Sequence, residues 1–418
     1  MDITRRPRRT DSDSLANGPL EPYFDAFKQY LAQHGYAAQT SCSYVVEVSH
    51  FARWARTKRL RLNKVNEASI AEFLDEHLPN CKCGAPVRHD RSDHSAALGH
   101  LLVVLRSLGA IPPAALGAAP VDVELRRYDE YMEHARGLVP ATRSMALSII
   151  GRLLTERFGS DAIDIAAITP DQVRRFFAQE ALRYSKPSSL ASVVASLRGY
   201  LRYHVSLGDH VHGGLTNAMA YPANWKQSAL PKTLTTEEVA QLINALGQPG
   251  PSMRRADAIV RCALDLGLRS GEIARLSLDD IDWSAGAVTL RHTKGGREDV
   301  LPLPASTGKA VAAYLKQERP HTTSRAIFVR LMAPIDQPVG PDLVRKVIRQ
   351  AYARAGLPYT RSHLLRHTMA NRLLAGGSSL KEVADVLRHR SLNTTMIYAK
   401  LDSRNLTAVA LPWPGSAA

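Results

Sequence analysis

Apolar residues recur at helical spacing over two successive stretches of the chain, as they do in helices that bury one face. Phe51 and Phe73 lie at such positions in the first stretch, and Leu153 and Phe176 lie at such positions in the second. Each stretch therefore predicts a small bundle of about four helices. Prolines and small residues at 111–120 (IPPAALGAAP) interrupt the pattern and predict a connection between the two bundles.

A second interruption divides the rest of the chain, because glycines and prolines break the helical pattern between the second bundle and the C-terminal part. The predicted organisation, in chain order, is a disordered basic arm at 1–18, an N-terminal helical domain at 19–110, a second helical domain at 121–212, a linker at 213–232 and a C-terminal domain at 233–418.

The two N-terminal domains resemble each other. Residues 66–73 (NEASIAEF) align with 169–176 (TPDQVRRF), and both copies close on Ser-Leu-Gly, at 107–109 and 206–208. The offset is 103 residues at the first match (66 to 169) and 99 at the second (107 to 206). An ordered run of matches at a nearly constant offset predicts that the N-terminal domain is a duplicate of the second.

The C-terminal domain has a mixed pattern. Thr235 with Glu238, and Ser379 with Glu382, predict capping boxes that begin two helices, and Ser362 is predicted to cap a third. Strand-like alternation in GAVTLRH and DVLPLP, on either side of a glycine-bearing turn, predicts a hairpin. The predicted fold is mostly α, with helical N-terminal domains followed by a mixed, mainly α domain that contains a small antiparallel sheet.

Charge indicates the class of partner. The chain has 54 Lys and Arg against 39 Asp and Glu, a formal net charge of +15. Such a surplus is typical of proteins that bind nucleic acid, because cations on phosphates release counterions. A basic protein without a polyanionic partner is the alternative. Basic residues on the helices of the second domain could contact a DNA backbone or could simply be solvated: Arg174, Arg175, Lys186, Arg198 and Arg202.

Other classes are disfavoured. No segment reaches the roughly 18 apolar residues of a membrane span, and the N-terminal 14 residues (MDITRRPRRTDSDS) lack the apolar region of a secretory signal. The four cysteines are too few for a disulfide scaffold and fit a reducing cytoplasm. We therefore expect a cytoplasmic protein without a membrane anchor.

Polar residues of the C-terminal domain supply the groups that phosphodiester transesterification needs. Arg269 and Arg366 offer two guanidiniums to hold the non-bridging phosphate oxygens. Tyr398 offers a hydroxyl nucleophile, and His363, three residues before Arg366 on one helix face, is placed to accept its proton. Taken singly, each residue has an ordinary explanation, such as an ion pair or a half-buried tyrosine.

Two further residues complete this set. Lys294, on the predicted hairpin turn, could protonate the departing 5′-oxygen, and His389 could donate a hydrogen bond to the phosphate. The order of the six residues resembles the signature of the tyrosine recombinase (phage-integrase-like) family: Arg, Lys, His-x-x-Arg, His or Trp, and Tyr. Glu272 corresponds to the acidic residue that supports the first Arg. The chain has LRHRS where the family often has Leu-Gly-His, and TKGG in place of Gly-Lys-Gly, which bears on Lys294.

The resemblance covers about residues 234–400 strongly, and the second helical domain resembles the family's core-binding, SAM-like domain more weakly. It implies DNA cleavage through a 3′-phosphotyrosyl intermediate and strand exchange without a cofactor or metal. It also implies double-stranded DNA as the substrate, a homo-tetramer on DNA, possible partner recombinases, and a bacterial enzyme associated with the nucleoid when bound to DNA. A C-terminal segment, 406–411, would dock on a neighbouring subunit.

Two alternatives remain open beside site-specific recombination in DNA integration or transposition. One is relaxation of DNA by a type IB topoisomerase, and the other is a DNA-binding regulator without catalysis, which the complete set of six residues disfavours. The sequence does not separate an integrase from a transposase or a resolvase, although the added N-terminal domain favours a mobile-element enzyme. The DNA target sequence is not predicted.

Two pairs of possible metal ligands stand out. Cys81 and Cys83, with His89 and His94 downstream, could bind zinc, but the C-x-C spacing is uncommon in structural sites and a plain loop is the favoured interpretation. His363 and His367 have the spacing of a metalloprotease pair, but the Glu of that motif is missing from HLLRH, so a zinc hydrolase is rejected.

Overall fold

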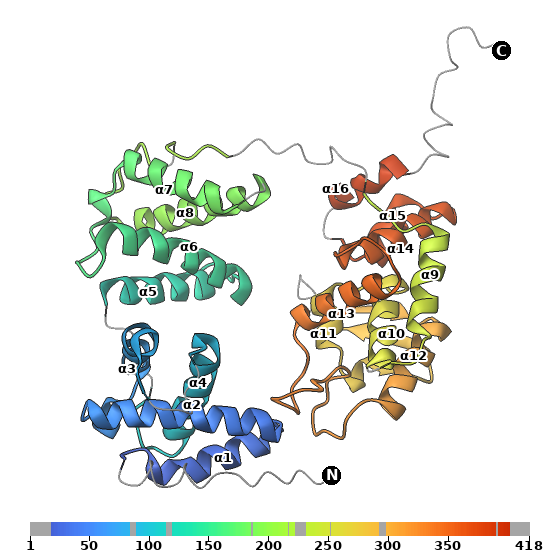
Figure 1. The fold of residues 1–418 in the computed structure, drawn as a ribbon. Coiled ribbons are helices and arrows are strands. Elements are labelled where there is room, and N and C mark those ends of the chain that lie inside the picture. Colours follow the sequence, from blue (N-terminus) through green and yellow to red (C-terminus); the bar gives the residue numbers. More distant parts are fainter. Residues whose placement is uncertain are drawn as a thin grey trace, which may run out of the picture. The chain divides into compact units, whose positions relative to one another are not determined.

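The computed structural model describes residues 18–83, 89–113, 119–184, 187–215, 217–221, 231–250, 252–291, 298–389 and 392–401. These residues are mainly helical, with one small antiparallel sheet (Figure 1), so the predicted mostly α fold is confirmed. Four sequence predictions lie outside the described residues: nearly all of the arm at 1–18, the candidate residues Lys186 and Lys294, and the docking segment 406–411.

The first helical region packs its apolar positions inward, as the sequence predicts. Phe27, Phe51, Phe73 and Leu98 are fully buried, and the rings of Phe51 and Phe73 meet edge to face. Its elements are η1 Glu21–Tyr23, α1 Phe24–Gln33, α2 Ala38–Thr57, η2 Leu62–Lys64, α3 Glu67–Glu72, the π-helical turn η3 Phe73–His77, η4 Leu78–Asn80 and α4 Arg91–Ser107.

The second helical region is built on proline-initiated helices, a position where the missing N–H costs nothing. Its elements are α5 Pro120–His134, α6 Pro140–Phe158, η5 Ile165–Ala167, α7 Pro170–Arg183 and α8 Pro187–Leu207 (Figure 1). Ile150, Leu154, Val193 and Tyr200 are fully buried in one core cluster, and this cluster fixes the faces that the four α-helices turn inward.

The segments that align in sequence also begin their helices in the same way. In the first copy, the Asn66 side chain accepts from the Ser69 backbone N–H and the Ser69 hydroxyl accepts from that of Asn66. In the second copy, Thr169 and Gln172 form the same reciprocal cap. This shared cap supports the predicted duplication, which stays a prediction.

The C-terminal region places most of its helices around a single apolar core, in which Leu242, Ile259, Ile273, Val344 and Leu365 are fully buried. Its elements are α9 Thr236–Leu246, α10 Met253–Leu264, α11 Ser270–Arg275, η6 Leu278–Asp280, β1 Ile281–Asp282, β2 Ala287–Leu290, β3 Asp299–Pro302, α12 Ala305–Gln317, α13 Pro341–Arg354, α14 His363–Ala375, α15 Leu380–Val386, α16 Leu392–Thr395 and η7 Met396–Leu401.

The predicted hairpin is confirmed, since β2 and β3 pair antiparallel with Val288 opposite Leu301, and β1 adds to the other edge of β2. The capping boxes at Thr235 and Ser379 are also confirmed. Ser362 stands at the N-cap position of α14, as predicted, but its side chain makes no capping hydrogen bond. Its backbone is already helical (φ −63°, ψ −28°), and its hydroxyl accepts a hydrogen bond from Ser270 Oγ at 2.9 Å rather than capping α14.

The described residues divide into two compact units. The first takes in the described parts of Met1–Arg61, Ile70–Leu105 and Gln227–Ala418, and the second those of Leu62–Ser69 and Arg106–Lys226. The domain boundaries drawn from the sequence stay a prediction. Among the described residues, no helix is long and apolar enough to cross a membrane.

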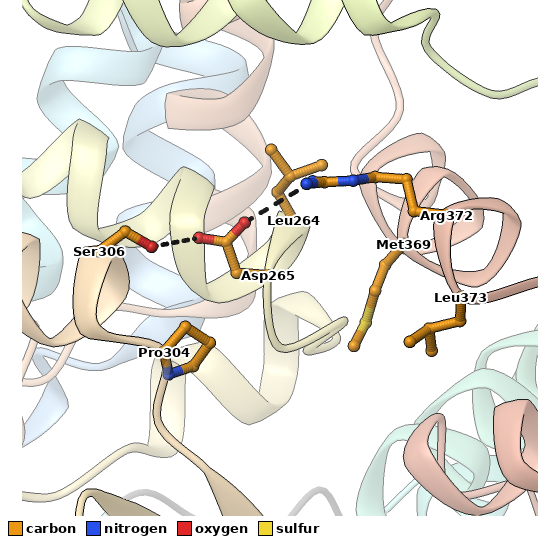
Figure 2. Close-up of a pocket in the computed structure, with 7 residues that line it drawn as sticks. All are labelled: Leu264, Asp265, Pro304, Ser306, Met369, Arg372 and Leu373. Atoms are coloured by element: carbon orange, nitrogen blue, oxygen red, sulfur yellow. Dashed lines mark hydrogen bonds and ion pairs between the residues drawn. The ribbon is translucent and has the colours of Figure 1, made fainter. Parts of the chain in front are cut away.

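A pocket of about 420 Å³ marks the junction of α10, α12 and α14. Figure 2 shows the Asp265 carboxylate pointing between Ser306 and Arg372, with Met369 and Leu373 beside it. The carboxylate accepts from Ser306 Oγ at 3.4 Å and lies 4.0 Å from an Arg372 nitrogen. None of the catalytic candidates that the structure describes lines this pocket, so we interpret it as a gap in the packing of these three helices rather than as the active site.

Candidate active site

Tyr398 lies on the short helix η7 with its side chain turned inward. The residue is 1% exposed and packs with Ala370, Val383 and Leu387 in a small apolar cluster. Burial raises the pKa of its hydroxyl to about 12, although the charges of nearby Arg366 and Arg269 act in the opposite direction. The hydroxyl is therefore protonated at neutral pH.

The imidazole that contacts this hydroxyl belongs to His367, on α14. Its Nδ1 lies 2.7 Å from the Tyr398 hydroxyl oxygen. Desolvation, followed by the neighbours His363 and Arg366, lowers the pKa of His367 to about 4, so the ring is neutral at pH 7. A neutral imidazole with its hydrogen on Nε2 presents Nδ1 as an acceptor for the phenol proton.

Arg366, one residue before, is held by two backbone carbonyls. Its guanidinium donates to the carbonyl oxygens of Gly267 and Leu387, and the residue is 4% exposed. Gly267 follows α10 with φ +58°, and a Cβ there would lie 2.6 Å from Met369 Sδ. Only glycine tolerates both this left-handed backbone conformation and so close an approach of the Met369 side chain. The resulting turn directs the Gly267 carbonyl toward Arg366.

Glu272 joins two arginines at the start of α11. One carboxylate oxygen accepts from Arg269 Nη1 at 2.7 Å, and the other accepts from Arg388 Nη2 at 2.8 Å. The second oxygen also accepts from the Arg269 backbone N–H at 2.8 Å. Burial by itself would raise the pKa of Glu272, but Arg388, that backbone hydrogen bond and Arg269 outweigh it, and the pKa is lowered.

The cluster carries more positive than negative charge. Among its described residues, three guanidiniums (Arg269, Arg366 and Arg388) surround the carboxylate of Glu272. Desolvation, then the charges of Arg269 and Arg388, lower the pKa of Arg366 to about 9. Buried cations that destabilise one another in this way are the arrangement expected where an anion is to bind.

The two remaining histidines border the same place. His363 begins α14 and lines, with His367, a pocket of about 690 Å³. His389 Nδ1 lies 2.7 Å from Thr395 Oγ1, and its ring lies parallel to that of Tyr398, at 4° with centroids 6.4 Å apart. Desolvation lowers the pKa of both, that of His389 to about 4, and Arg366 and Arg269 contribute in each case.

Five of the six sequence candidates fall in this region, and Lys294 lies outside the described residues. The assignment of His363 as proton acceptor stays a prediction, because the imidazole at hydrogen-bond distance from Tyr398 is that of His367. Sequence reasoning considered His367 only as half of a metal pair. The spacing of residues within HLLRH gave no signal that the last His, rather than the first, faces the tyrosine.

Arg388 was also missed. Its side chain is 4% exposed and donates to Glu272, 116 residues earlier in the chain. A long-range buried ion pair leaves no local pattern, although an Arg immediately before the candidate His389 could have prompted the question.

The candidate DNA-contact residues divide into two kinds. Arg174, Arg175 and Arg202 are exposed on α7 and α8, and Arg174 pairs with Asp171. Arg198 is partly buried: it donates to the Met219 carbonyl at 2.8 Å, and its guanidinium lies 4.7 Å from the centre of the Tyr221 ring. These contacts hold Arg198 against the segment that follows α8, whereas the three exposed arginines remain available to contact a DNA backbone.

Comparison with known proteins matches residues 232–404 to the phage integrase family. Over 405 residues the chain is 33% identical to y4rA of Sinorhizobium fredii, a protein assigned as an integrase/recombinase, with 96% of each chain covered. Over 257 residues it is 32% identical to tyrosine recombinase XerC of Azotobacter vinelandii, covering 61% of this chain and 82% of XerC.

Solved structures share the fold. The XerH site-specific recombinase, in a post-cleavage complex with its difH substrate, matches with TM-score 0.53 and 18% identity, covering 82% of this chain and 95% of that one. The Tn1549 transposon integrase, in complex with a circular intermediate DNA, matches with TM-score 0.50 and 16% identity over 69% and 99% of the two chains. With the full-length relative at 33% identity, these findings show that the chain belongs to the tyrosine recombinase family.

Proposed function

We propose that this protein is a site-specific DNA recombinase in which Tyr398 is the nucleophile, acting in DNA integration or transposition. The observation that carries the proposal is the Tyr398 hydroxyl, which lies 2.7 Å from the neutral imidazole of His367. In the same cluster, the guanidiniums of Arg269 and Arg388 share the single carboxylate of Glu272, so positive charge is in excess. A nucleophile, a proton acceptor and a cationic site for a phosphate are the requirements of a phosphoryl transfer to tyrosine.

The proposed reaction has two exchanges. The Tyr398 oxygen bonds to the scissile phosphorus while the bond from phosphorus to the 5′-oxygen breaks, which leaves a 3′-phosphotyrosyl link and a free 5′-hydroxyl. The phenol proton passes to His367 or, as the sequence predicts, to His363, and Lys294 is the predicted proton donor to the 5′-oxygen. A 5′-hydroxyl from a partner strand then attacks the phosphotyrosine and releases Tyr398, so no external energy source is needed.

The arginines would hold the phosphate as its charge grows. Arg269 and Arg366 are ordered before DNA arrives, the first by Glu272 and the second by backbone carbonyls. Donors that are already in place stabilise the transition state without a cost of reorganisation. In the free protein, desolvation and then the repulsion among the arginines lower the pKa of Arg366. An incoming phosphate would relieve that repulsion.

The substrate would be double-stranded DNA, bound by a homo-tetramer or with partner recombinases, because exchange requires two duplexes and several active sites. The exposed residues Arg174, Arg175 and Arg202 are proposed to contact the DNA backbone. We also propose that the enzyme works in the cytoplasm and is associated with the nucleoid when bound to DNA.

Capture of the covalent intermediate tests the proposal. A binding site is first selected from a random duplex library with the full chain, and a nick is then placed on the 3′ side of the scissile phosphate, so that the short fragment with the free 5′-hydroxyl diffuses away. The wild-type chain should give an adduct that survives denaturant, and Tyr398→Phe should give none.

Tyr359→Phe is the matched control, because this tyrosine lies by the pocket and bonds to Glu238 rather than to the cluster. It should retain the adduct. An adduct that persists in Tyr398→Phe would overturn the assignment, with Tyr352 the next nucleophile to test. Relaxation of plasmids that lack the selected site would support a type IB topoisomerase instead.

A further inference from the structure

Four side chains in the N-terminal helical region direct ligand atoms toward one point, away from the candidate active site. Two are histidines, on α2 and at the end of the π-helical turn η3, and two are cysteines in the segment that follows η4. Their ligand atoms all lie within 4.8 Å of one another: His50, His77, Cys81 and Cys83.

The separations are those of a tetrahedral metal site. Zinc bonds of about 2.0–2.1 Å to nitrogen and about 2.3 Å to sulfur place tetrahedral ligands about 3.3 Å apart for two nitrogens and about 3.6 Å apart for nitrogen and sulfur. The Nε2 atoms of His50 and His77 are 3.3 Å apart. Cys81 Sγ lies 3.2 Å from His50 Nε2, and Cys83 Sγ lies 3.7 Å from His77 Nε2.

A fifth residue orients the first ligand. His50 is fully buried, and its other ring nitrogen, Nδ1, lies 3.4 Å from His94 Nε2. His94 Nδ1 in turn lies 2.9 Å from the Asp90 carbonyl oxygen, which can only accept. His94 therefore carries its hydrogen on Nδ1 and accepts from His50 Nδ1–H, which leaves the His50 Nε2 lone pair directed at the cluster.

The side of the cluster formed by the two histidines is aromatic. The Phe73 ring packs edge to face on His50 at 5.1 Å and stacks on His77 at 5.3 Å, and Trp54 lies 6.3 Å from His77. His50, which is fully buried on this side, is costly unless its polar atoms are satisfied, whereas His77 and Cys81 are half-buried and Cys83 is exposed. Both cysteines are free thiols in this structure.

We propose that the N-terminal helical region contains a structural zinc site with four protein ligands: His50, His77, Cys81 and Cys83. A tetrahedral set of two thiolates and two imidazoles selects Zn²⁺ among the common metals. Because all four positions are filled by protein, the site has no open position for a substrate and is structural rather than catalytic. The ion would join α2 to the segment that follows η4, and each cysteine would lose its thiol proton on binding.

This set differs from the hypothesis drawn from sequence. His50 lies 31 residues before Cys81, too far for a spacing motif, and only the packing of α2 brings it in. His89 is exposed and is not among the clustered ligands, and His94 orients a ligand instead of binding the metal. The plain-loop interpretation of Cys81 and Cys83 did not take His50 and His77 into account.

Metal content of the full-length protein tests the proposal. After purification without chelator and removal of loosely bound metal, elemental analysis should find one zinc per chain. After the zinc is exchanged for Co²⁺, the spectrum should show the intense visible bands of tetrahedral cobalt and a thiolate charge-transfer band. Cys81→Ser and Cys83→Ser should each weaken zinc binding at least tenfold and lose part of that thiolate band.

Matched variants separate ligands from neighbours. Cys42→Ser, at an exposed cysteine on the same helix α2, and His89→Gln should both bind zinc like the wild type. His94→Gln should lower zinc affinity about 10- to 100-fold, as loss of an orienting partner does, yet retain the tetrahedral cobalt spectrum. A purely structural role for His94 would leave the affinity per folded molecule unchanged.

The cobalt spectrum of the wild-type chain keeps the proposal falsifiable even where a variant fails to fold. Absence of stoichiometric metal after exposure to a zinc buffer, or octahedral cobalt without a thiolate band, would overturn it. Iron or copper at full occupancy would overturn the choice of metal. A disulfide between Cys81 and Cys83 in protein purified in reducing buffer would exclude the site. None of these results depends on recombinase activity, because they are read from metal and thiols alone.

Discussion

Gly267→Ala tests whether the backbone turn after α10 positions Arg366, the arginine proposed to bind the phosphate. The new Cβ would lie 2.6 Å from Met369 Sδ and 2.9 Å from Leu387 Cδ2, at a residue with φ +58°. A left-handed alanine costs about 1–2 kcal/mol, and crowding of a packed interior costs about 1–3 kcal/mol more. We therefore expect the free energy of unfolding to fall by about 2–5 kcal/mol.

Gly286→Ala is the matched control, because it adds the same Cβ at nearly the same backbone conformation. This glycine lies between β1 and β2 with φ +61°, and no described atom lies within 4 Å of the place that the added methyl group would take. Only the conformational cost of about 1–2 kcal/mol applies there. The difference between the two variants therefore isolates the contacts made around Gly267.

Activity should separate them further. The Gly267 carbonyl accepts from Arg366, so a shift of the turn moves the guanidinium that is proposed to hold the phosphate. A displacement of about 1 Å in a catalytic group can cost about 100-fold in rate. Denaturant unfolding and the rate of adduct formation on the nicked site, both at a temperature where the variants are folded, measure the two effects. Equal losses of stability and rate in the two variants would refute the reasoning.

Three further predictions follow from the same contacts. His367→Gln should slow adduct formation about 10²- to 10⁴-fold without weakening DNA binding in a gel-shift assay, and a normal rate would remove His367 from the proton path. Glu272→Gln should lower the free energy of unfolding by about 3 kcal/mol at pH 7. Because the pKa of Glu272 is lower in the folded than in the unfolded state, this contribution is fully present above about pH 4 and is lost as the pH falls further through the lower folded pKa, so wild type and variant should converge in acid. Arg202→Ala should reduce the salt dependence of DNA binding by about one ion, whatever the DNA sequence.

The sequence predicted what is local and periodic. The helices with capping boxes at Thr235 and Ser379 begin where the pattern places them, and the hairpin forms where it was expected because alternation and a turn are properties of neighbouring residues. At Ser362 the position of the cap was right, but the side-chain hydrogen bond does not form and the backbone is already helical. Contacts across the fold were out of reach: Arg388 reaches Glu272 over 116 residues, and His50 meets Cys81 over 31.

One part of the candidate site is already in place before DNA binds, and another part is not. The arginines are held by groups that DNA does not supply, namely Glu272 and the carbonyls of Gly267 and Leu387. The proposed nucleophile is different: Tyr398 is buried, protonated and hydrogen-bonded to His367, whose pKa of about 4 is far below the value of about 12 for the hydroxyl. Proton transfer from Tyr398 to His367 in the free protein is therefore unfavourable. We expect activation to depend on the bound phosphate, so variants of the arginines should weaken transition-state binding, whereas variants of His367 should change the step that removes the proton from the Tyr398 hydroxyl.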